Sequence, residues 1–490
     1  MRAQSFCTGR QTMTRYQQIA STLRAQINQG EYPVGARLPG IRQLAMLSGA
    51  SITTVQSACN LLQDEGLIEA RLRAGLYVCP PRQTSLTPVH QAPQPRAPIL
   101  LTPTSITAEV MQQSLNPQHI PLGAAIPEAD FLGMDLLNHI RRRRTHQGNE
   151  DAKYAVPPGS AELRQAIARN YATRGAPIAA ESIIITNGCH EALVLALRCV
   201  TQPGDTVAIE SPSYYGFLQA MQGLGLNILE IPNHPDTGLG LEALDFALAR
   251  WTIKAVIVTP NFSNPMGSQM PSDRKSALVA RLRAFDTVLI EDDIYSELFH
   301  HGTRPDTCLQ YDEAGDTVIH CSSVSKTLAP GLRIGWVISP RFVPLLIEQK
   351  ILLNIATASL PQAWVAQLLI SAKWQQHLSL VRRRHALAMA KMQQAVMTFF
   401  PEGTRISQPR GGFVLWVELA ASLDGTALMR HAIEHHISIT PGTLFAINGA
   451  FRHCIRLNAA VHWSPQVEAA IAFLGHAVRD PIFHRSADKR

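Results

Sequence analysis

One lysine set among small hydroxylic residues constrains this chain more than any other feature of its sequence. Residues 322–336 read SSVSKTLAPGLRIGW, so Lys326 directly follows Ser325 and Arg333 comes seven positions later. An aldehyde-bearing phosphate compound needs these groups, because an amine forms a Schiff base with the aldehyde and hydroxyl and guanidinium groups bind the phosphate. A lysine and an arginine on a polar surface loop are the alternative interpretation, which the flanking apolar residues weaken. The segment therefore predicts a cofactor site centred on Lys326.

An apolar segment that ends in carboxylates lies upstream of this lysine. Residues 288–295 read VLIEDDIY, the pattern of a short strand followed by a loop. A pyridine ring acts as an electron sink only while its nitrogen stays protonated beside a carboxylate, and Asp292 is the candidate for that partner. Tyr295 follows three positions later and is a candidate for the ring hydroxyl. An ordinary strand with acidic residues at its exposed end is the alternative, and this segment alone does not exclude it.

Three further segments supply polar, flexible or aromatic groups. Residues 256–267 predict a strand and a turn in which the Asn264 amide can bind a phenolic oxygen. Residues 183–193 pass from a strand through Gly188 into a helix start, where free backbone N–H groups and the helix dipole suit a phosphate. Tyr214 offers a ring that can stack on a flat heterocycle, although a tyrosine of the core is the commoner meaning.

Together these segments resemble a known enzyme family. From about Leu122 to its C-terminus the chain is similar to the fold type I, pyridoxal 5′-phosphate (PLP)-dependent aminotransferases of class I/II. The resemblance implies an α/β fold with a large PLP-binding domain and a smaller C-terminal subdomain. Six motifs in the family's order carry it: Tyr154 before Pro-Pro-Gly, the Asn-Gly-Cys-His turn at residues 187–190, Tyr214, Asn264 with Pro265, Asp292 with Tyr295, and Lys326 with Arg333.

The resemblance also implies roles for single residues. Lys326 corresponds to the Schiff-base lysine, Asp292 to the partner of the pyridine nitrogen, and Tyr214 completes the catalytic set. Asn264 and Tyr295 would bind the ring oxygen. The phosphate would be held by Ser323, Ser325, Arg333 and the backbone around Gly188 and Cys189.

Two correspondences concern the ligand and the assembly. Arg456, in the sequence Ile-Arg-Leu-Asn at residues 455–458, corresponds to the arginine that binds the substrate carboxylate through a bidentate fork. An arginine on an exposed strand face is the alternative. Tyr154 corresponds to a phosphate-binding tyrosine of the neighbouring subunit, which implies a homodimer. His190 and residues 124–131 are possible pocket residues to which no role is assigned.

The first hundred residues differ in charge from the rest. They contain ten arginines, no lysine and four acidic residues, so they carry +6 of the formal net charge of +7. A compact basic module is the electrostatic signature of a polyanion-binding domain, because it neutralises backbone phosphates. A basic solvated surface is the alternative.

Local patterns in this module predict three helices and a hairpin. The first helix spans residues 16–29, the second begins at Leu38 and Pro39, and the third follows an N-cap at Ser51 and spans residues 52–64. Residues 67–78 predict a two-stranded wing with Gly75 in its turn. The blocks resemble a GntR-type winged helix-turn-helix domain, which implies binding of double-stranded DNA. By that resemblance the DNA-facing residues are Arg37, Arg42, Ser51, Thr53, Thr54 and the minor-groove loop from Arg73 to Gly75. This chain differs from many members of the family at Ile52, where they carry an arginine or another polar residue.

A proline-rich segment separates the two modules. Residues 79–103 contain seven prolines and show no helical or strand period, which predicts a semi-rigid extended linker. The expected boundaries are residues 13–79 for the winged helix-turn-helix domain, 80–103 for the linker and 104–490 for the aminotransferase-like domain. The whole chain resembles the MocR-type transcriptional regulators.

The resulting hypothesis is a homodimeric, PLP-dependent transcriptional regulator. It would bind double-stranded DNA and sense PLP, or an amino acid or amine effector that forms an external aldimine. A catalytically active aminotransferase with an accessory DNA-binding head is the alternative, since Lys326, Asp292 and Arg456 are all retained. A sensor of the cofactor's own concentration is a third interpretation. The effector and the operator are open, as is the choice between activation and repression.

The remaining sequence features bear on location and metals. The N-terminus has no hydrophobic signal region, and no run reaches the roughly 18 apolar residues of a membrane span. The eight cysteines show no paired metal spacing, so we expect reduced thiols and no metal site. These features indicate a cytoplasmic protein without membrane contact. Whether residues 1–12 belong to the native chain is open.

Overall fold

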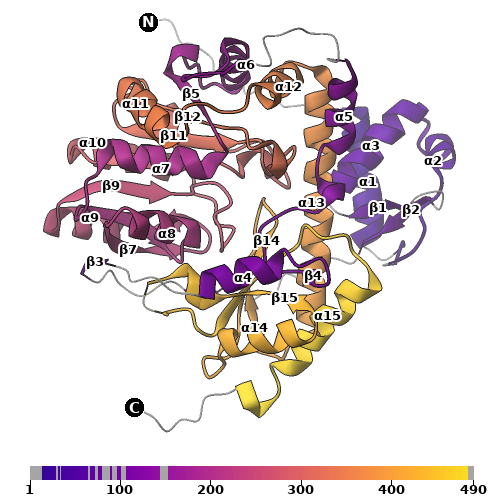
Figure 1. Cartoon of the computed structure of the whole chain (residues 1–490). Helices are drawn as coiled ribbons and strands as arrows, with labels where there is room; N and C mark the ends of the chain where they lie inside the picture. The colour runs from indigo at the N-terminus through magenta and orange to yellow at the C-terminus, as the bar shows by residue number, and fades with distance from the viewer. Residues whose placement is uncertain are drawn as a thin grey trace, which may run out of the picture. The chain divides into compact units, whose positions relative to one another are not determined.

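The computed structural model describes residues 14–28, 31–33, 35–64, 67–71, 75–79, 89–90, 97–100, 106–143, 153–447 and 449–483. The chain divides into two compact units, Met1–Ser85 and Leu86–Arg490, coloured along the sequence in Figure 1. Arg73, expected in the DNA-contacting loop, lies outside the described residues.

The smaller unit contains three helices followed by a hairpin. Helices α1 (Arg15–Asn28), α2 (Ile41–Ser48) and α3 (Ile52–Asp64) precede the antiparallel strands β1 (Ile68–Arg71) and β2 (Gly75–Val78). This is the order of a winged helix-turn-helix domain. Apolar side chains at helical spacing form its core, which includes Ile19, Ala20, Leu23, Leu44, Ala45, Val55, Ala58, Cys59 and Leu62.

The second helix begins later than the sequence predicted. Leu38 is buried, and its backbone N–H donates to the carbonyl oxygen of Leu76 in β2 at 2.8 Å. This bond holds Leu38 beside the hairpin, so α2 begins at Ile41 instead of Leu38. Gly75 is the first residue of β2 and pairs with Arg71, so it lies in the strand and not in the turn.

The larger unit is built on a mixed nine-stranded sheet in the order β3-β7-β6-β9-β10-β11-β12-β5, with β8 paired to β7. The neighbouring pairs from β7 to β11 are parallel, whereas β12 is antiparallel to both β11 and β5. The strands are β3 (Ile99–Leu100), β5 (Ile183–Thr186), β6 (Thr206–Ser211), β7 (Asn227–His234), β8 (Gly238–Leu239), β9 (Ile253–Val258), β10 (Val288–Asp292), β11 (Val318–Ser323) and β12 (Gly335–Ile338).

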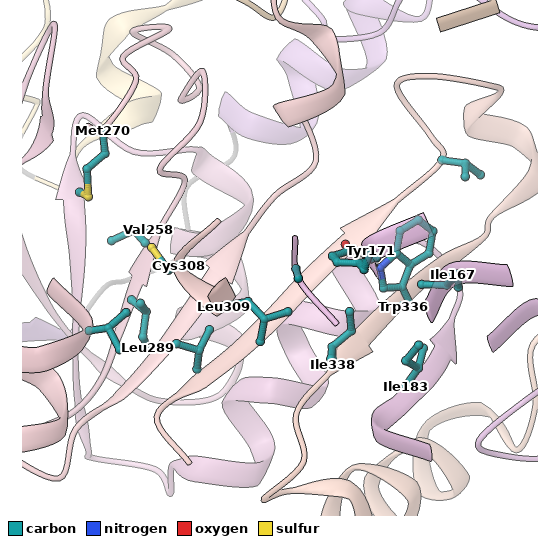
Figure 2. Close-up of a cluster of buried hydrophobic side chains, with 14 of the residues drawn as sticks. Ile167, Tyr171, Ile183, Val258, Met270, Leu289, Cys308, Leu309, Trp336 and Ile338 are labelled. Carbon is teal, nitrogen blue, oxygen red and sulfur yellow. Dashed lines mark hydrogen bonds between the residues drawn. The ribbon is translucent and has the colours of Figure 1, made fainter. Parts of the chain in front are cut away.

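Both faces of this sheet are buried under helices, as expected for parallel strands that read as continuous apolar runs. Alternate residues of a strand enter different cores: Val256 and Val258 join one cluster, whereas Ala255 and Ile257 join another. Figure 2 shows the first cluster, with Trp336 beside Tyr171. The helices around the sheet are α5 (Met134–Arg143), α6 (Ala161–Ala172), α7 (Cys189–Val200), α8 (Tyr215–Gly223), α9 (Leu241–Arg250), α10 (Ser272–Ala284), α11 (Val343–Asn354) and α12 (Ser359–Leu369).

A smaller C-terminal subdomain completes the larger unit. Its four-stranded sheet has the order β13-β14-β17-β16, and β15 pairs with β4. The long helix α13 runs along it in Figure 1. The elements are α4 (Ile106–Ser114), β4 (Ile120–Pro121), α13 (Ala372–Phe399), β13 (Arg405–Ile406), β14 (Val414–Glu418), α14 (Gly425–Glu434), β15 (Ile437–Ser438), β16 (Thr440–Pro441), β17 (Cys454–Asn458) and α15 (Pro465–Ala477).

Parts of the expected linker belong to the larger unit. Ile99 and Leu100 form the edge strand β3, which pairs with β7. Val89 is buried in the apolar cluster of the C-terminal subdomain, and the backbone N–H of His90 donates to Glu418 Oε2 at 2.8 Å. The segment is therefore docked at these points. Within the described part of the chain, no helix is both long and apolar enough to cross a membrane.

Candidate cofactor and ligand site

Strand ends bring the sequence-predicted residues to one edge of the large sheet. Gly335, at the start of β12, pairs with Ser323 at the end of β11 and with Thr186 at the end of β5. The loop that carries Lys326 therefore lies beside the turn at Gly188. This neighbourhood follows from the sheet order, because the carboxyl ends of β10 and β11 and the end of β5 meet at the same edge.

The close approach at this edge requires glycine. Gly188 has a φ of +83° and caps α7, and a Cβ atom there would collide with the guanidinium of Arg333. A Cβ atom at Gly335 would lie 2.8 Å from the backbone nitrogen of Cys189. Arg333 Nη2 donates to the carbonyl oxygen of Asn187 at 2.7 Å. The start of α7 thus presents backbone N–H groups next to a cation, which is an arrangement that suits a phosphate.

Lys326 has an environment that favours its neutral amine. Its Nζ donates to the carbonyl oxygen of Ala125 at 2.7 Å. Burial and, to a smaller extent, the positive charge of Arg456 lower the pKa of Lys326 to about 8, while the charge of Asp292 acts in the opposite direction. The neutral amine is the form that attacks an aldehyde, so a substantial fraction of Lys326 is reactive near neutral pH.

Asp292 is a buried carboxyl group that forms no salt bridge with another described residue, although the charge of Lys326 acts on it. Burial raises its pKa to about 7, while a hydrogen bond from the Cys189 thiol to Oδ1, 3.2 Å long, acts in the opposite direction. A protonated ring nitrogen would supply the missing positive charge. The sequence had assigned only the backbone of Cys189, so its side-chain contact with Asp292 is new.

Arg456 is fully buried and donates only to neutral groups. Its guanidinium donates to Asn264 Oδ1 at 3.0 Å, to Thr440 Oγ1 at 3.2 Å and to the carbonyl oxygen of Gly123. It packs over the Phe445 ring, and its Nε has no hydrogen-bond partner in the described structure. A buried cation without an anion is costly, so this position favours a carboxylate ligand. The strand is buried, which removes the alternative of an exposed strand face.

The ring-oxygen residues lie beside Arg456. Tyr295 is buried and hydrogen-bonded to Asn264, and burial raises the pKa of the Tyr295 phenol above its usual value. Tyr214 is half-buried, with its ring tilted 4.8 Å from Tyr215, and burial likewise raises its pKa. The charge of Arg456 acts on both phenols in the direction that lowers their pKa, so the residues share one site.

Three more residues were expected to bind the phosphate: Ser323, Ser325 and Tyr154. Ser323 and Ser325 are both buried, and the Ser325 backbone N–H donates to Ser323 Oγ at 3.2 Å. Tyr154 is 81% exposed, with no recorded contact to the site in this chain. Sequence reasoning left the carbonyl groups of Gly123 and Ala125 without a role, because a backbone acceptor leaves no signature in residue type.

The expected DNA-facing residues lie on the surface of the smaller unit. Ser51 Oγ accepts a hydrogen bond from the Thr54 backbone N–H at 3.1 Å, so Ser51 caps α3. Thr53 and Thr54 hydroxyl groups each lie 2.8 Å from Ser51 Oγ. Arg42 and Arg37 are exposed, and the Arg37 guanidinium lies against Gly75. Ile52 is also exposed, at the start of α3.

The residues present fit PLP on the chemistry of their donors. The site offers an amine of lowered pKa, a buried carboxyl group without a salt bridge to a described residue, a glycine-capped helix N-terminus and a buried guanidinium with an unpaired Nε. Lys326 would hold the aldehyde carbon, Asp292 the ring nitrogen, and the Gly188 turn with Arg333 the phosphate.

Comparisons with known proteins agree with this chemistry. Residues 127–474 match the family described as aminotransferase class I and II, and residues 15–78 match the bacterial regulatory proteins of the gntR family. The solved structure of a kynurenine aminotransferase from Pyrococcus horikoshii is 26% identical and covers 77% of this chain and 95% of its own, with a TM-score of 0.72. LysN, an α-aminoadipate aminotransferase from Thermus thermophilus solved with N-(5′-phosphopyridoxyl)-L-leucine, has a TM-score of 0.71 at 26% identity, over 77% of this chain and 95% of its own.

Two relatives share the whole layout. The HTH-type transcriptional regulator YjiR of Escherichia coli is 34% identical over 95% of this chain and 99% of its own length. YdcR of the same organism, also named an HTH-type transcriptional regulator, is 35% identical over 96% of this chain and all of its own length. The chain therefore belongs to the MocR-type family, in which a GntR-type DNA-binding head is joined to an aminotransferase class I and II domain.

Proposed function

We propose that this protein is a cytoplasmic, DNA-binding transcriptional regulator whose larger unit binds PLP and captures an amino compound that carries a carboxylate. The observation that carries the proposal is the buried guanidinium of Arg456, which has only neutral acceptors and an unpaired Nε. It lies close enough to Lys326 to lower the pKa of the amine. A ligand with an amino group for the cofactor and a carboxylate for Arg456 satisfies both groups.

The site residues divide the work of binding PLP and its ligand in this proposal. PLP supplies an aldehyde that condenses with amines and a ring that withdraws electrons. Lys326 would hold the cofactor through its amine, and its lowered pKa would allow Nζ to carry a proton to or from a bound ligand. Asp292 would keep the ring nitrogen protonated. Asn264 and Tyr295 would bind the ring oxygen, and Tyr214 would pack against the ring. Ser323, Ser325, Arg333 and the backbone at Gly188 and Cys189 would hold the phosphate.

The site is completed by a second subunit. Tyr154 is 81% exposed, and in the family it resembles a phosphate-binding residue that serves the neighbouring subunit. A homodimer in which each Tyr154 reaches the phosphate site of the partner is the arrangement that this resemblance implies.

The linker provides a physical route from the ligand to the DNA-binding head. Val89 and His90 dock on the C-terminal subdomain, and His90 bonds to Glu418 at the end of β14. Glu418 pairs with Cys454 in β17, the strand that carries Arg456. A ligand that shifts β17 therefore acts on the docked linker. It changes DNA binding only if it binds two arrangements of the subdomain unequally.

The test combines two titrations of the PLP-loaded, full-length protein. Absorbance follows the cofactor as a panel of amino acids is added without a keto acid, and each amino acid is compared with the amine that lacks its carboxylate. Fluorescence anisotropy follows binding to duplexes selected from a random pool. We expect amino acids to change both signals, and Arg456→Met to weaken the response at least tenfold. Arg452→Met, four residues away and exposed, is the matched control.

The outcomes separate three functions. A stable spectral change with altered DNA binding supports the proposed regulator. Conversion of the cofactor to its amine form with release of a keto acid, and no change in DNA binding, identifies an aminotransferase and overturns the proposal. DNA binding that follows PLP alone, without any response to amino acids, identifies a sensor of the cofactor and also overturns it.

A further inference from the structure

Three side chains of metal-binding type lie together at the end of α14 in the C-terminal subdomain. His431, Glu434 and His435 each offer one ligand atom, and these atoms lie within 4.8 Å of one another. The spacing of three and four residues places all three side chains on one face of the helix. They are separate in sequence and role from the residues assigned to PLP and its ligand.

The hydrogen bonds of this cluster leave a lone pair free for a metal ion. His435 Nδ1 lies 3.0 Å from the carbonyl oxygen of His431, and a carbonyl can only accept, so Nδ1 carries the proton. Nε2 of His435 is then the unprotonated nitrogen. A ring N–H that donates to a backbone carbonyl is the usual support of a metal-bound histidine. His431 Nδ1 lies 3.3 Å from Glu434 Oε2, and an ionised carboxylate can only accept, so this contact places the ring proton on Nδ1 and leaves Nε2 of His431 unprotonated.

The cluster is also held in place and open to solvent. The His431 ring stacks on Phe473 of α15 at 5.4 Å, and the His435 ring lies 4.4 Å from the same phenyl ring. These contacts reduce the rotamer freedom that a metal ion would otherwise have to remove. Glu434 is 71% exposed at its side chain. The C-terminal end of a helix carries a partial negative charge, which favours a cation.

We propose that His431, Glu434 and His435 bind one divalent transition-metal ion of the zinc class through two imidazole nitrogens and one carboxylate oxygen. Imidazole ligands suit Zn²⁺ and its neighbours, whereas Mg²⁺ requires oxygen ligands. Zinc bonds to these atoms are about 2.0–2.2 Å long, so small rotamer changes draw the three ligand atoms together around the ion. Three protein ligands leave the remaining coordination position to water or to another small ligand.

The test is calorimetric titration of the tag-free, PLP-loaded, full-length protein with Zn²⁺ and, separately, with Mg²⁺. We expect one Zn²⁺ per chain, no binding of Mg²⁺ at the same concentrations, and Zn²⁺ affinity weakened at least about tenfold by His435→Ala and by Glu434→Gln. Both side chains are exposed, so the metal-free variants should remain folded, with a thermal midpoint close to that of the parent. His476→Ala, an exposed histidine of α15, is the control that should retain the parent affinity.

Absorbance of the Co²⁺-substituted protein gives a second measurement. Imidazole coordination produces visible ligand-field bands, and these should disappear in His431→Ala and His435→Ala but not in His476→Ala. If His435→Ala and Glu434→Gln bound Zn²⁺ with the parent affinity, the ion would lie on other groups, such as thiols, and the proposal would be overturned. Loss of binding in His476→Ala to the same degree would also overturn it.

Discussion

The thiol of Cys189 donates a hydrogen bond to the carboxylate of Asp292 at 3.2 Å, which joins the first residue of α7 to the last residue of β10. Both groups are buried. Burial raises the pKa of Asp292 to about 7 and the thiol hydrogen bond lowers it, so Cys189 helps to keep this carboxyl ionised. The helix that presents N–H groups for a phosphate thus also tunes the group assigned to the ring nitrogen.

Replacing Cys189 should therefore weaken cofactor binding. Cys189→Ala removes the donor, so the pKa of Asp292 rises and more of the carboxyl is protonated at pH 7. A hydrogen bond to a charged group contributes about 1.5 kcal/mol, so the PLP dissociation constant should increase about tenfold at pH 7 and recover as the pH rises. Cys189→Ser, which keeps an O–H donor, should bind PLP nearly as well as the parent. Equal weakening in both variants would contradict this explanation.

The reaction of PLP with the cofactor-free protein should depend on pH through Lys326. Its pKa is lowered to about 8, so the neutral amine increases about tenfold per pH unit below 8 and becomes constant above it. The rate of covalent attachment, followed by absorbance, should show the same profile. Arg456→Met removes a positive charge that lowers this pKa and should shift the midpoint to higher pH. A rate that is flat between pH 7 and 9 would show that the amine does not control the step.

A buried hydrogen bond between Glu291, the residue before Asp292 in β10, and His320 should contribute to stability. His320 Nδ1 lies 2.7 Å from Glu291 Oε2, and His320 Nε2 lies 2.7 Å from the Tyr171 hydroxyl. Burial works to raise the pKa of Glu291, but His320 and two backbone N–H groups outweigh it and the pKa is lowered.

A hydrogen bond to a charged group contributes about 1.5–3 kcal/mol, so Glu291→Gln should lower the free energy of unfolding by about that amount and lower the denaturation midpoint with it. Since the folded pKa of Glu291 lies below its unfolded value, this stabilisation is present above about pH 4.5 and declines as the pH falls below it. Glu242→Gln, on the exposed face of α9, is the control and should leave the midpoint within error. Equal midpoints for Glu291→Gln and the parent would contradict the prediction.

The docked linker should be released when Glu418 loses its charge. Burial works to raise the pKa of Glu418, but hydrogen bonds from His453 and His90 outweigh it and hold the pKa at about 2. Glu418→Gln should therefore loosen the anchoring of His90, and hydrogen exchange of the His90 backbone N–H, which donates to Glu418, should become several-fold faster. Glu402→Gln, an exposed residue after α13, should leave this exchange at the parent rate. Identical exchange rates in all three proteins would show that the charge does not hold the linker.

Much of the site was accessible from the sequence because its residues follow strand ends in short, ordered motifs. Asp292, Ser323 and Gly188 each come at the junction of an apolar strand with a polar turn, and such junctions are encoded within a few residues. The helices of the head were predicted for the same reason, since Ser51 and the apolar period of α3 are local signals. The start of α2 was misplaced because a long-range bond from Leu38 to Leu76 decides it.

The sequence by itself determined the two-module layout, and it singled out the candidate lysine, carboxyl, amide and guanidinium groups, because residue type and order specify these. Only the tertiary structure decided how those groups act on one another. Four hydrogen bonds show this, and each joins residues distant in sequence. They link Arg456 to Asn264, Lys326 to the carbonyl of Ala125, Cys189 to Asp292, and His90 to Glu418. Burial and charge proximity set the pKa values of these groups, and both quantities exist only after the chain has folded.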